Sequence, residues 1–276
     1  MKKFEPSGLT PGDLLLHNGR DDISKLIAWA GGSQYSHAAL VHHDFDLREA
    51  SASGVRRYSL HERLADTTNY AFIDVYRRPA GLGTTQAKQV DAVADHYLKT
   101  PYPLSNLAYL GIMCAVRDKI VANKWLRWAL RTITDQLVSG DTNFMVCSEL
   151  VYRSYAEAKV EPSIKPRIVV PETSDLPFPD IDREALYNEW YRDTHPAAAS
   201  ATTALTIPQD IPDVSDALLR ESYTKLLANM NANSRLQNHR AMDPPMIEIN
   251  PNPRTIMPSD LEHSPDFELL GRVTGA

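Results

Sequence analysis

Short apolar runs separated by polar turns dominate residues 11–80 of the chain. Residues 14–16, 37–41 and 71–76 are each apolar and bounded by polar or turn-forming residues, as buried strands are. Residues 47–50 read as a further strand beside the second run, and Gly54 lies near the next turn. The pattern predicts an antiparallel sheet in this part of the chain.

Helical spacing of apolar residues appears outside these strands. It predicts helices over residues 23–30, 84–98, 147–158 and 215–230. Gly31 and Gly32 end the first of them, and Pro101 and Pro103 stop the second. Strands near the N-terminus with helices after them predict an α+β protein.

Residues 104–140 form an apolar and basic block with its own helical stripe. Leu126, Leu130 and Ile133 lie on that stripe, which Trp125 and Trp128 widen. The first interpretation is a helical hairpin that packs its stripe onto the rest of the domain. The second is a lid, a substrate wall or a membrane-surface element, given the tryptophans and the basic residues.

The composition changes toward the C-terminus. Residues 162–179 contain five prolines, and nine more follow from Pro196 to the end. We therefore expect residues 1–195 to form the main domain, with 104–140 as an insertion, and residues 196–276 to form a Pro-rich extension with one helix.

Charge and cysteine content narrow the class of protein. The 276 residues carry a formal net charge of −6, which argues against a dedicated nucleic-acid binder. The two cysteines cannot build a disulfide framework, and no CxxC pair suggests zinc. His42 and His43 are not expected to share an ion, because adjacent strand residues point to opposite faces. We expect no metal and no other cofactor.

The N-terminal residues and the lengths of the apolar runs indicate where in the cell the protein is located. Lys2 and Lys3 are not followed by the apolar stretch of a signal peptide, and no run of about 20 apolar residues is present. We expect no transmembrane segment and a cytoplasmic protein, unless a signal-independent secretion system exports it.

Cys147 occupies the most informative position in the sequence. It follows the apolar residues 144–146 and begins the predicted helix 147–158. The unpaired N–H groups and the partial positive charge at a helix N-terminus favour a thiolate over a thiol. The alternative is an ordinary buried cysteine, which is the interpretation given to Cys114 in its apolar surroundings.

Two further residues could assist such a thiol. His37 begins an apolar strand after a Gly-rich turn, where a general base can be held rigidly. Glu49 follows twelve residues later, a spacing that suits a neighbouring antiparallel strand. Its carboxylate could orient the imidazole. Each residue taken alone also suits a purely structural role.

Taken together and in order, five motifs resemble a known family. They are residues 11–16 (PGDLLL), 35–41 (YSHAALV), 48–50 (REA), 100–102 (TPY) and 147–151 (CSELV). They look like the permuted NlpC-type papain-like cysteine peptidase/amidase family, in its YiiX-like branch, where the histidine strand precedes the cysteine helix. The resemblance covers about residues 8–160. Compact members run almost directly from the Pro-Tyr motif to the cysteine, whereas residues 103–146 intervene here.

The resemblance implies a circularly permuted papain-like fold, with an antiparallel sheet against the helix that carries the cysteine. Cys147 is then the nucleophile, His37 the base and Glu49 the third polar residue. Substrate-side roles fall to Tyr35, Ser36, Tyr102 and Asp13. The implied reaction of this thiol protease or amidase is hydrolysis of an amide bond in peptidoglycan peptides, without metal or cofactor.

Several functions stay open at this point. An antibacterial effector toxin would reconcile a wall substrate with the missing signal peptide, and its partners would be an immunity protein or a secretion system. A lipid acyltransferase or thioesterase of the lecithin–retinol-acyltransferase type is an alternative suggested by the amphipathic insertion. The third is a non-catalytic binding domain on the same fold.

Overall fold

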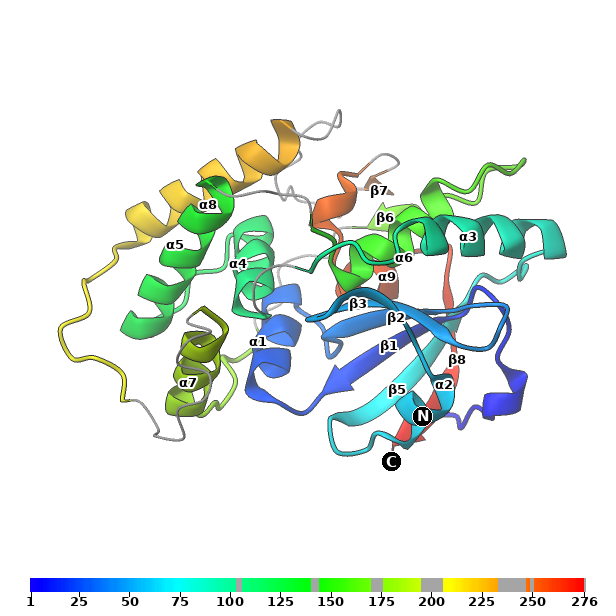
Figure 1. Cartoon of the computed structure of the whole chain (residues 1–276), viewed down its shortest axis with the longest axis horizontal. Helices are drawn as coiled ribbons and strands as arrows, with labels where there is room; N and C mark the ends of the chain where they lie inside the picture. Colours follow the sequence, from blue (N-terminus) through cyan, green and yellow to red (C-terminus); the bar gives the residue numbers. More distant parts are fainter. Residues whose placement is uncertain are drawn as a thin grey trace.

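A six-stranded antiparallel sheet forms the centre of the computed structural model (Figure 1). The structure describes residues 1–102, 106–139, 144–169, 176–194, 206–232, 247–248 and 251–275. The strands run in the order β4-β3-β2-β1-β5-β8. Their bounds are β1 (Leu14–Gly19), β2 (His37–Val41), β3 (Leu47–Ser51), β4 (Gly54–Tyr58), β5 (Tyr70–Arg77) and β8 (Glu268–Gly275). A short pair, β6 (Ile168–Val169) with β7 (Ile247–Glu248), lies outside it.

The helices differ widely in length. Their bounds are α1 (Asp22–Gly31), α2 (Leu60–Ala65), α3 (Thr84–His96), α4 (Asn106–Arg117), α5 (Lys124–Ser139), α6 (Cys147–Ala156), α7 (Arg183–Thr194), α8 (Asp216–Ala232) and α9 (Pro258–Glu262). The helices predicted over 23–30, 84–98, 147–158 and 215–230 are confirmed as α1, α3, α6 and α8. Local signals explain these limits well. For α1, Asp21 accepts a hydrogen bond from the Ser24 N–H at 2.7 Å, and Gly32 ends the helix with φ 69°.

Both faces of the sheet are buried, which explains why strand β1 begins with three consecutive leucines. Leu14 and Leu16 pack in a cluster with Val151 and Tyr155 of α6. Leu15 belongs to the cluster on the opposite face, where Leu64 of α2 also packs. A strand covered on both sides reads as a continuous apolar run rather than an alternating one.

The block 104–140 is a helical hairpin, α4 followed by α5, as the first interpretation predicted. Its tryptophans pack inward: Trp125 meets the ring of Tyr187 with centroids 5.8 Å apart, and Trp128 meets Trp190 at 5.4 Å. In Figure 1, α4, α5, α7 and α8 gather on the side of the molecule away from β5 and β8. The hairpin is therefore part of a helical layer shared with the C-terminal half of the chain.

The expectation that residues 196–276 form a separate extension is wrong for their last part. Strand β8 pairs with β5 along its length, and Arg272 Nε donates to the buried Asp74 carboxylate at 2.8 Å. The N-terminus also meets this strand, since the Phe4 N–H donates to the Arg272 carbonyl at 2.8 Å. The Pro-rich composition predicted an extended tail, but the residues beyond the last proline form strand β8 and complete the sheet.

No helix in the described part of the chain is both long enough and apolar enough to span a lipid bilayer.

Candidate active site

Cys147 is the first residue of α6 and is completely buried. Val146 before it is extended, so the helix begins sharply and its first N–H groups have no intrahelical partner. Burial raises the pKa of the Cys147 thiol, but the charge of His37 and a hydrogen bond from it outweigh burial. A hydrogen bond from the Ala38 backbone N–H adds to this effect, and the pKa lies below its ordinary value.

His37 opens strand β2 and bridges two groups. Its Nε2 lies 3.1 Å from Glu49 Oε2, which leaves Nδ1 as the ring nitrogen for Cys147. Burial lowers the pKa of the imidazole, but the hydrogen-bonded thiolate and then the carboxylate outweigh it and raise the pKa to about 9. A thiol of lowered pKa beside an imidazole of raised pKa favours a thiolate–imidazolium pair at neutral pH.

Glu49 lies on β3, which pairs antiparallel with β2 as the twelve-residue spacing predicted. Its side chain is fully buried, and Arg63 Nη2 donates to both carboxylate oxygens at 2.7 and 2.6 Å. Arg56 Nη2 donates to Oε1 at 2.7 Å. Burial alone would raise the pKa of Glu49, but the hydrogen bond to His37 and these guanidinium groups hold it well below its ordinary value. Glu49 is therefore an anion that faces His37.

Arg63 holds this carboxylate from a position the sequence did not single out. The residue is buried on α2, and its guanidinium carbon lies 4.5 Å from the centre of the Tyr58 ring and 4.7 Å from that of Tyr70. Stacking between two rings fixes the plane of a guanidinium and compensates part of its desolvation. The helix α2 thereby orients Glu49 from outside the sheet.

His17 is a second residue that the sequence analysis missed. It lies directly across from His37 in the β1–β2 ladder, and the two ring centroids are 5.0 Å apart. The side chain is buried, and neither ring nitrogen has a hydrogen-bond partner within the described residues. Burial, and after it the charges of His37 and Arg63, hold the pKa of His17 well below its ordinary value. A neutral His17 leaves the positive charge on His37.

Tyrosines of the helical layer reach the thiol. The hydroxyl of Tyr109, on α4, lies 3.8 Å from Cys147 Sγ and 3.3 Å from Ser148 Oγ. Tyr102 packs edge-on against Tyr109 at 6.1 Å, and its pKa is raised by burial and then by the charge of Cys147. The structure thus brings Tyr102 to the cluster together with Tyr109, which lies in the predicted insertion but was not itself singled out by the sequence.

The C-terminal segment also touches the start of α6. Ser148 Oγ donates to the Ile256 carbonyl at 2.6 Å, and both groups are buried. The residue next to Cys147 is thus fixed by a part of the chain more than 100 positions away along the sequence.

Of the other predicted substrate-side residues, Ser36 lies beside His37 with its Oγ 3.5 Å from the His17 carbonyl, whereas Tyr35 and Asp13 are engaged elsewhere. Tyr35 is buried with its hydroxyl donating to Asp74 at 2.9 Å, and Ser36 Oγ accepts from the Gly19 N–H at 3.1 Å. Asp13 lies beside Val41, at the end of the β1–β2 ladder away from His37, and pairs with Arg77 at 2.6 Å. Hydrogen bonds within the fold engage all three side chains, and their substrate-side roles stay predictions.

Cys114 matches its predicted packing role. It is completely buried on α4, and burial raises the pKa of its thiol to about 12. The two cysteines therefore differ in the direction of their pKa shifts as well as in position.

His42 and His43 are not adjacent residues of a strand, although the prediction that they cannot share an ion assumed this. Strand β2 ends at Val41, so both residues lie in the turn beyond it, where side chains do not alternate. Their rings are tilted by 41° with centroids 4.1 Å apart.

Comparisons with known proteins add little. No protein-family model and no curated protein matches the chain. Among solved structures it is similar to the metalloprotein yiiX from Escherichia coli O157:H7, DUF1105, with 22% identity and a TM-score of 0.37. The match covers 54% of this chain and 66% of yiiX, just under two thirds of its length.

Proposed function

We propose that this protein is a cysteine hydrolase that cleaves an amide bond in peptidoglycan peptides, as an amidase or endopeptidase. The observation that carries the proposal is the position of His37 between the Cys147 thiol and the buried Glu49 carboxylate, with a raised imidazole pKa and a lowered thiol pKa. This is the arrangement of a nucleophile, a base and an orienting group, and in a permuted papain-like fold it arises in this chain order.

The chemistry follows from the protonation states. The Cys147 thiolate attacks the amide carbonyl carbon, a C–S bond forms, and the carbonyl electron pair moves to oxygen. N–H groups in the first turn of α6 face that oxyanion. His37 then gives its Nδ1 proton to the nitrogen, and the C–N bond breaks to release an amine. Water, deprotonated by His37, attacks the thioester and restores the thiol with a carboxylate product.

Glu49 acts through His37 in this scheme. Its carboxylate fixes Nε2 at 3.1 Å, so that Nδ1 points to the thiol, and its charge stabilises the imidazolium. Arg56 and Arg63 keep the carboxylate ionised. A carboxylate that two arginines keep ionised stabilises a charged imidazole better than an uncharged amide side chain would.

Access to the thiol is the remaining requirement. Cys147 has no exposed surface, whereas the His37 side chain is 15% exposed. A substrate therefore enters along the His37 side and displaces neighbouring side chains, of which Tyr109 and Tyr102 are the candidates. In this scheme α4 is a wall of the site.

The choice of substrate comes from the resemblance of the motifs to the NlpC-type family. A wall substrate also suits an antibacterial effector that a secretion system delivers. The lipid acyltransferase alternative drew on the amphipathic insertion with its tryptophans and basic residues, and Trp125 and Trp128 pack against Tyr187 and Trp190. No observation on the structure favours that alternative.

The test is digestion of purified peptidoglycan by the full-length protein and by Cys147→Ala, followed by mass spectrometry of the muropeptides. We expect one class of peptide to be cut into a new amine and a new carboxylate by the wild type alone. Cys114→Ala is the matched control and should digest like the wild type. Muropeptides left unchanged by the wild type would count against the proposal.

A further inference from the structure

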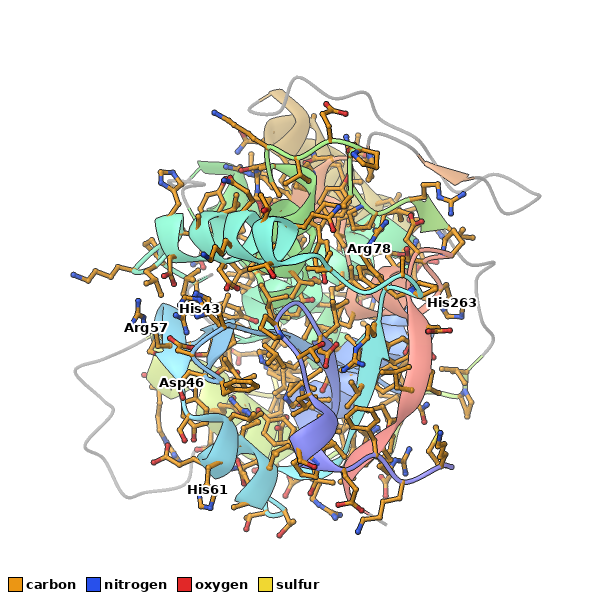
Figure 2. The ribbon with its side chains drawn as sticks, turned by 90° about the vertical axis from the view of Figure 1, so that its right-hand side faces the viewer. His43, Asp46, Arg57, His61, Arg78 and His263 are labelled. Atoms are coloured by element: carbon orange, nitrogen blue, oxygen red, sulfur yellow. The ribbon has the colours of Figure 1, made fainter. Side chains whose placement is uncertain are left out.

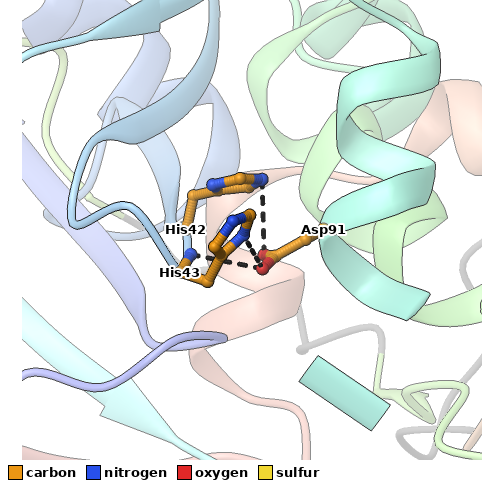
Figure 3. A group of neighbouring side chains, drawn as sticks. All are labelled: His42, His43 and Asp91. Carbon is orange, nitrogen blue, oxygen red and sulfur yellow. Dashed lines mark hydrogen bonds and ion pairs between the residues drawn. The ribbon is translucent and has the colours of Figure 1, made fainter. Parts of the chain in front are cut away.

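His42, His43 and Asp91 form a compact group at the end of strand β2 remote from His37 (Figure 3). The two histidines come from the turn between β2 and β3, and Asp91 comes from α3. One ligand-type atom from each residue lies within 4.8 Å of the other two. The group contains two imidazoles and one carboxylate, which are preferred ligands of Zn²⁺.

Two buried atoms of this group lack hydrogen-bond partners among the described residues. They are His42 Nε2 and Asp91 Oδ1, which lie 3.9 Å apart. The side chains are only 1% and 4% exposed, so neither atom is satisfied by bulk water. Asp95 Oδ2 is 3.5 Å from His42 Nε2, beyond an ordinary hydrogen bond. Unpaired buried polar atoms are costly, and a cation between these two would satisfy both.

The other atoms of the two buried side chains are already held. His42 Nδ1 lies 2.9 Å from Asp44 Oδ1 and 3.4 Å from the Asp44 backbone N–H; binding of an ion at Nε2 takes the tautomer whose Nδ1 proton is directed at the carboxylate. Asp91 Oδ2 accepts from the His43 backbone N–H at 3.2 Å, which turns Oδ1 toward His42. A carboxylate that orients a ligating histidine is the usual outer partner in metal sites.

The third candidate ligand is more open. His43 is 63% exposed, and its Nδ1 is 2.8 Å from Asp91 Oδ2. Figure 2 shows it at the surface. His43 also lines a cavity of about 650 Å³, together with Thr10, Leu82 and Lys88. An ion bound here would have a route of entry and room for a water ligand.

Local charge favours a cation. The carboxylates of Asp44, Asp91 and Asp95 lie around His42. The buried Arg48 is the opposing charge, and its Nη2 lies 3.0 Å from His42 Nδ1. Arg48 Nη2 also donates to Asp44 at 2.9 Å and Arg48 Nε donates to Asp95 at 2.5 Å, so these two bonds persist when Nδ1 carries a proton and only the bond to Nδ1 is lost.

We infer that His42 Nε2, His43 Nδ1 and the Asp91 carboxylate bind one Zn²⁺ ion, with water as the fourth ligand. Zn–N bonds of about 2.0–2.1 Å place tetrahedral ligands about 3.4 Å apart, so the group closes by about 1 Å and the His43–Asp91 hydrogen bond is replaced. His37 opens β2 and His42 lies one residue beyond its other end, so about 17 Å of extended chain separates them and the ion takes no part in chemistry at Cys147. It fastens α3 to the turn that joins the strands carrying His37 and Glu49.

The test uses the full-length protein freed of metal with a chelator and then titrated with Zn²⁺ against a chromophoric competitor. The expected result is one saturable equivalent, with binding at least tenfold weaker in His43→Ala and in Asp91→Asn. His61→Ala, an exposed histidine far from the group (Figure 2), and Cys147→Ala should bind like the wild type. His43→Ala removes an exposed side chain, so the variant should fold like the wild type. Circular dichroism checks this.

A second readout reports on the ligands themselves. Co²⁺ in place of Zn²⁺ should give the visible absorption of a four-coordinate site in the wild type and lose it in His43→Ala. Zn²⁺ should also raise the midpoint of thermal unfolding of the wild type, and much less that of His43→Ala. The inference is overturned if no saturable site is found, if His43→Ala binds as tightly as the wild type, or if binding is lost in Cys147→Ala.

Discussion

Replacing Glu49 with glutamine tests how the site sets the charge of His37. The change keeps the size of the side chain and removes its negative charge. A hydrogen bond to a charged group contributes about 1.5–3 kcal/mol, and 1.36 kcal/mol corresponds to one pH unit. We therefore expect the pKa of His37 to fall from about 9 by about 1 to 2 in the variant.

The same change leaves Arg56 and Arg63 without their carboxylate. Breaking a buried ion pair costs about 3–5 kcal/mol, and glutamine retains one acceptor oxygen, so the loss of stability should lie near the lower end of that range. Arg63 keeps its stacking on Tyr58 and Tyr70, which limits rearrangement. Urea unfolding of the variant measures this cost, and it shows whether the variant is folded where the pKa is measured.

The assay is an NMR titration of the His37 ring carbons in the wild type and in Glu49→Gln, which needs no substrate. Arg56→Gln is the control, because Arg56 contacts Oε1 of Glu49 and not the oxygen that faces His37. It should leave the pKa of His37 unchanged or raise it slightly, because it removes a positive charge and keeps the Glu49 carboxylate. A wild-type His37 that titrates at or below the ordinary histidine value, or an identical pKa in Glu49→Gln, would refute the reasoning.

Three further changes follow from the same contacts. Tyr109→Phe removes a hydrogen bond to the sulfur, worth about 0.5–1.5 kcal/mol, and should slow alkylation of Cys147 at neutral pH by about 2- to 10-fold; an unchanged rate would exclude this contact from thiolate stabilisation. Amide hydrolysis should decline as the pH rises through about 9, because His37 must carry the proton for the leaving amine. A rate of hydrolysis that does not change up to pH 10 would contradict this. Asp74→Ala removes the buried carboxylate that accepts hydrogen bonds from Arg272 of β8 and from Tyr35, and should lower the free energy of unfolding by about 3–5 kcal/mol in urea melts; an unaffected stability would show that this carboxylate does not anchor β8.

Much of the fold was predictable where local signals decide it. Helix α1 has an aspartate cap and a terminal glycine, and the short apolar strand β2 is joined to β3 by a tight turn. The pairing of His37 with Glu49 could be anticipated because twelve residues are enough for one turn and two short strands, so that contact is local.

The rest of the site depends on contacts between distant parts of the chain. Tyr109 reaches Cys147 from α4, and Ile256 receives the hydrogen bond of Ser148 from the C-terminal segment. Neither residue carries a periodic or motif signal, because their contribution depends on how α4 and the tail pack. Tyr35 shows the opposite case: its motif position suggested the site, and its hydroxyl donates to the buried Asp74 instead of pointing to Cys147.

The most direct measurement of the central claim is the relative reactivity of the two cysteines toward a small thiol reagent at neutral pH, followed by peptide mapping. The account predicts that Cys147 is modified first, to one equivalent, and that His37→Ala slows this reaction while Cys114 stays unmodified in the folded protein. Both thiols are fully buried, so the difference comes from ionisation rather than exposure. Equal and slow modification of Cys147 and Cys114 would contradict the account.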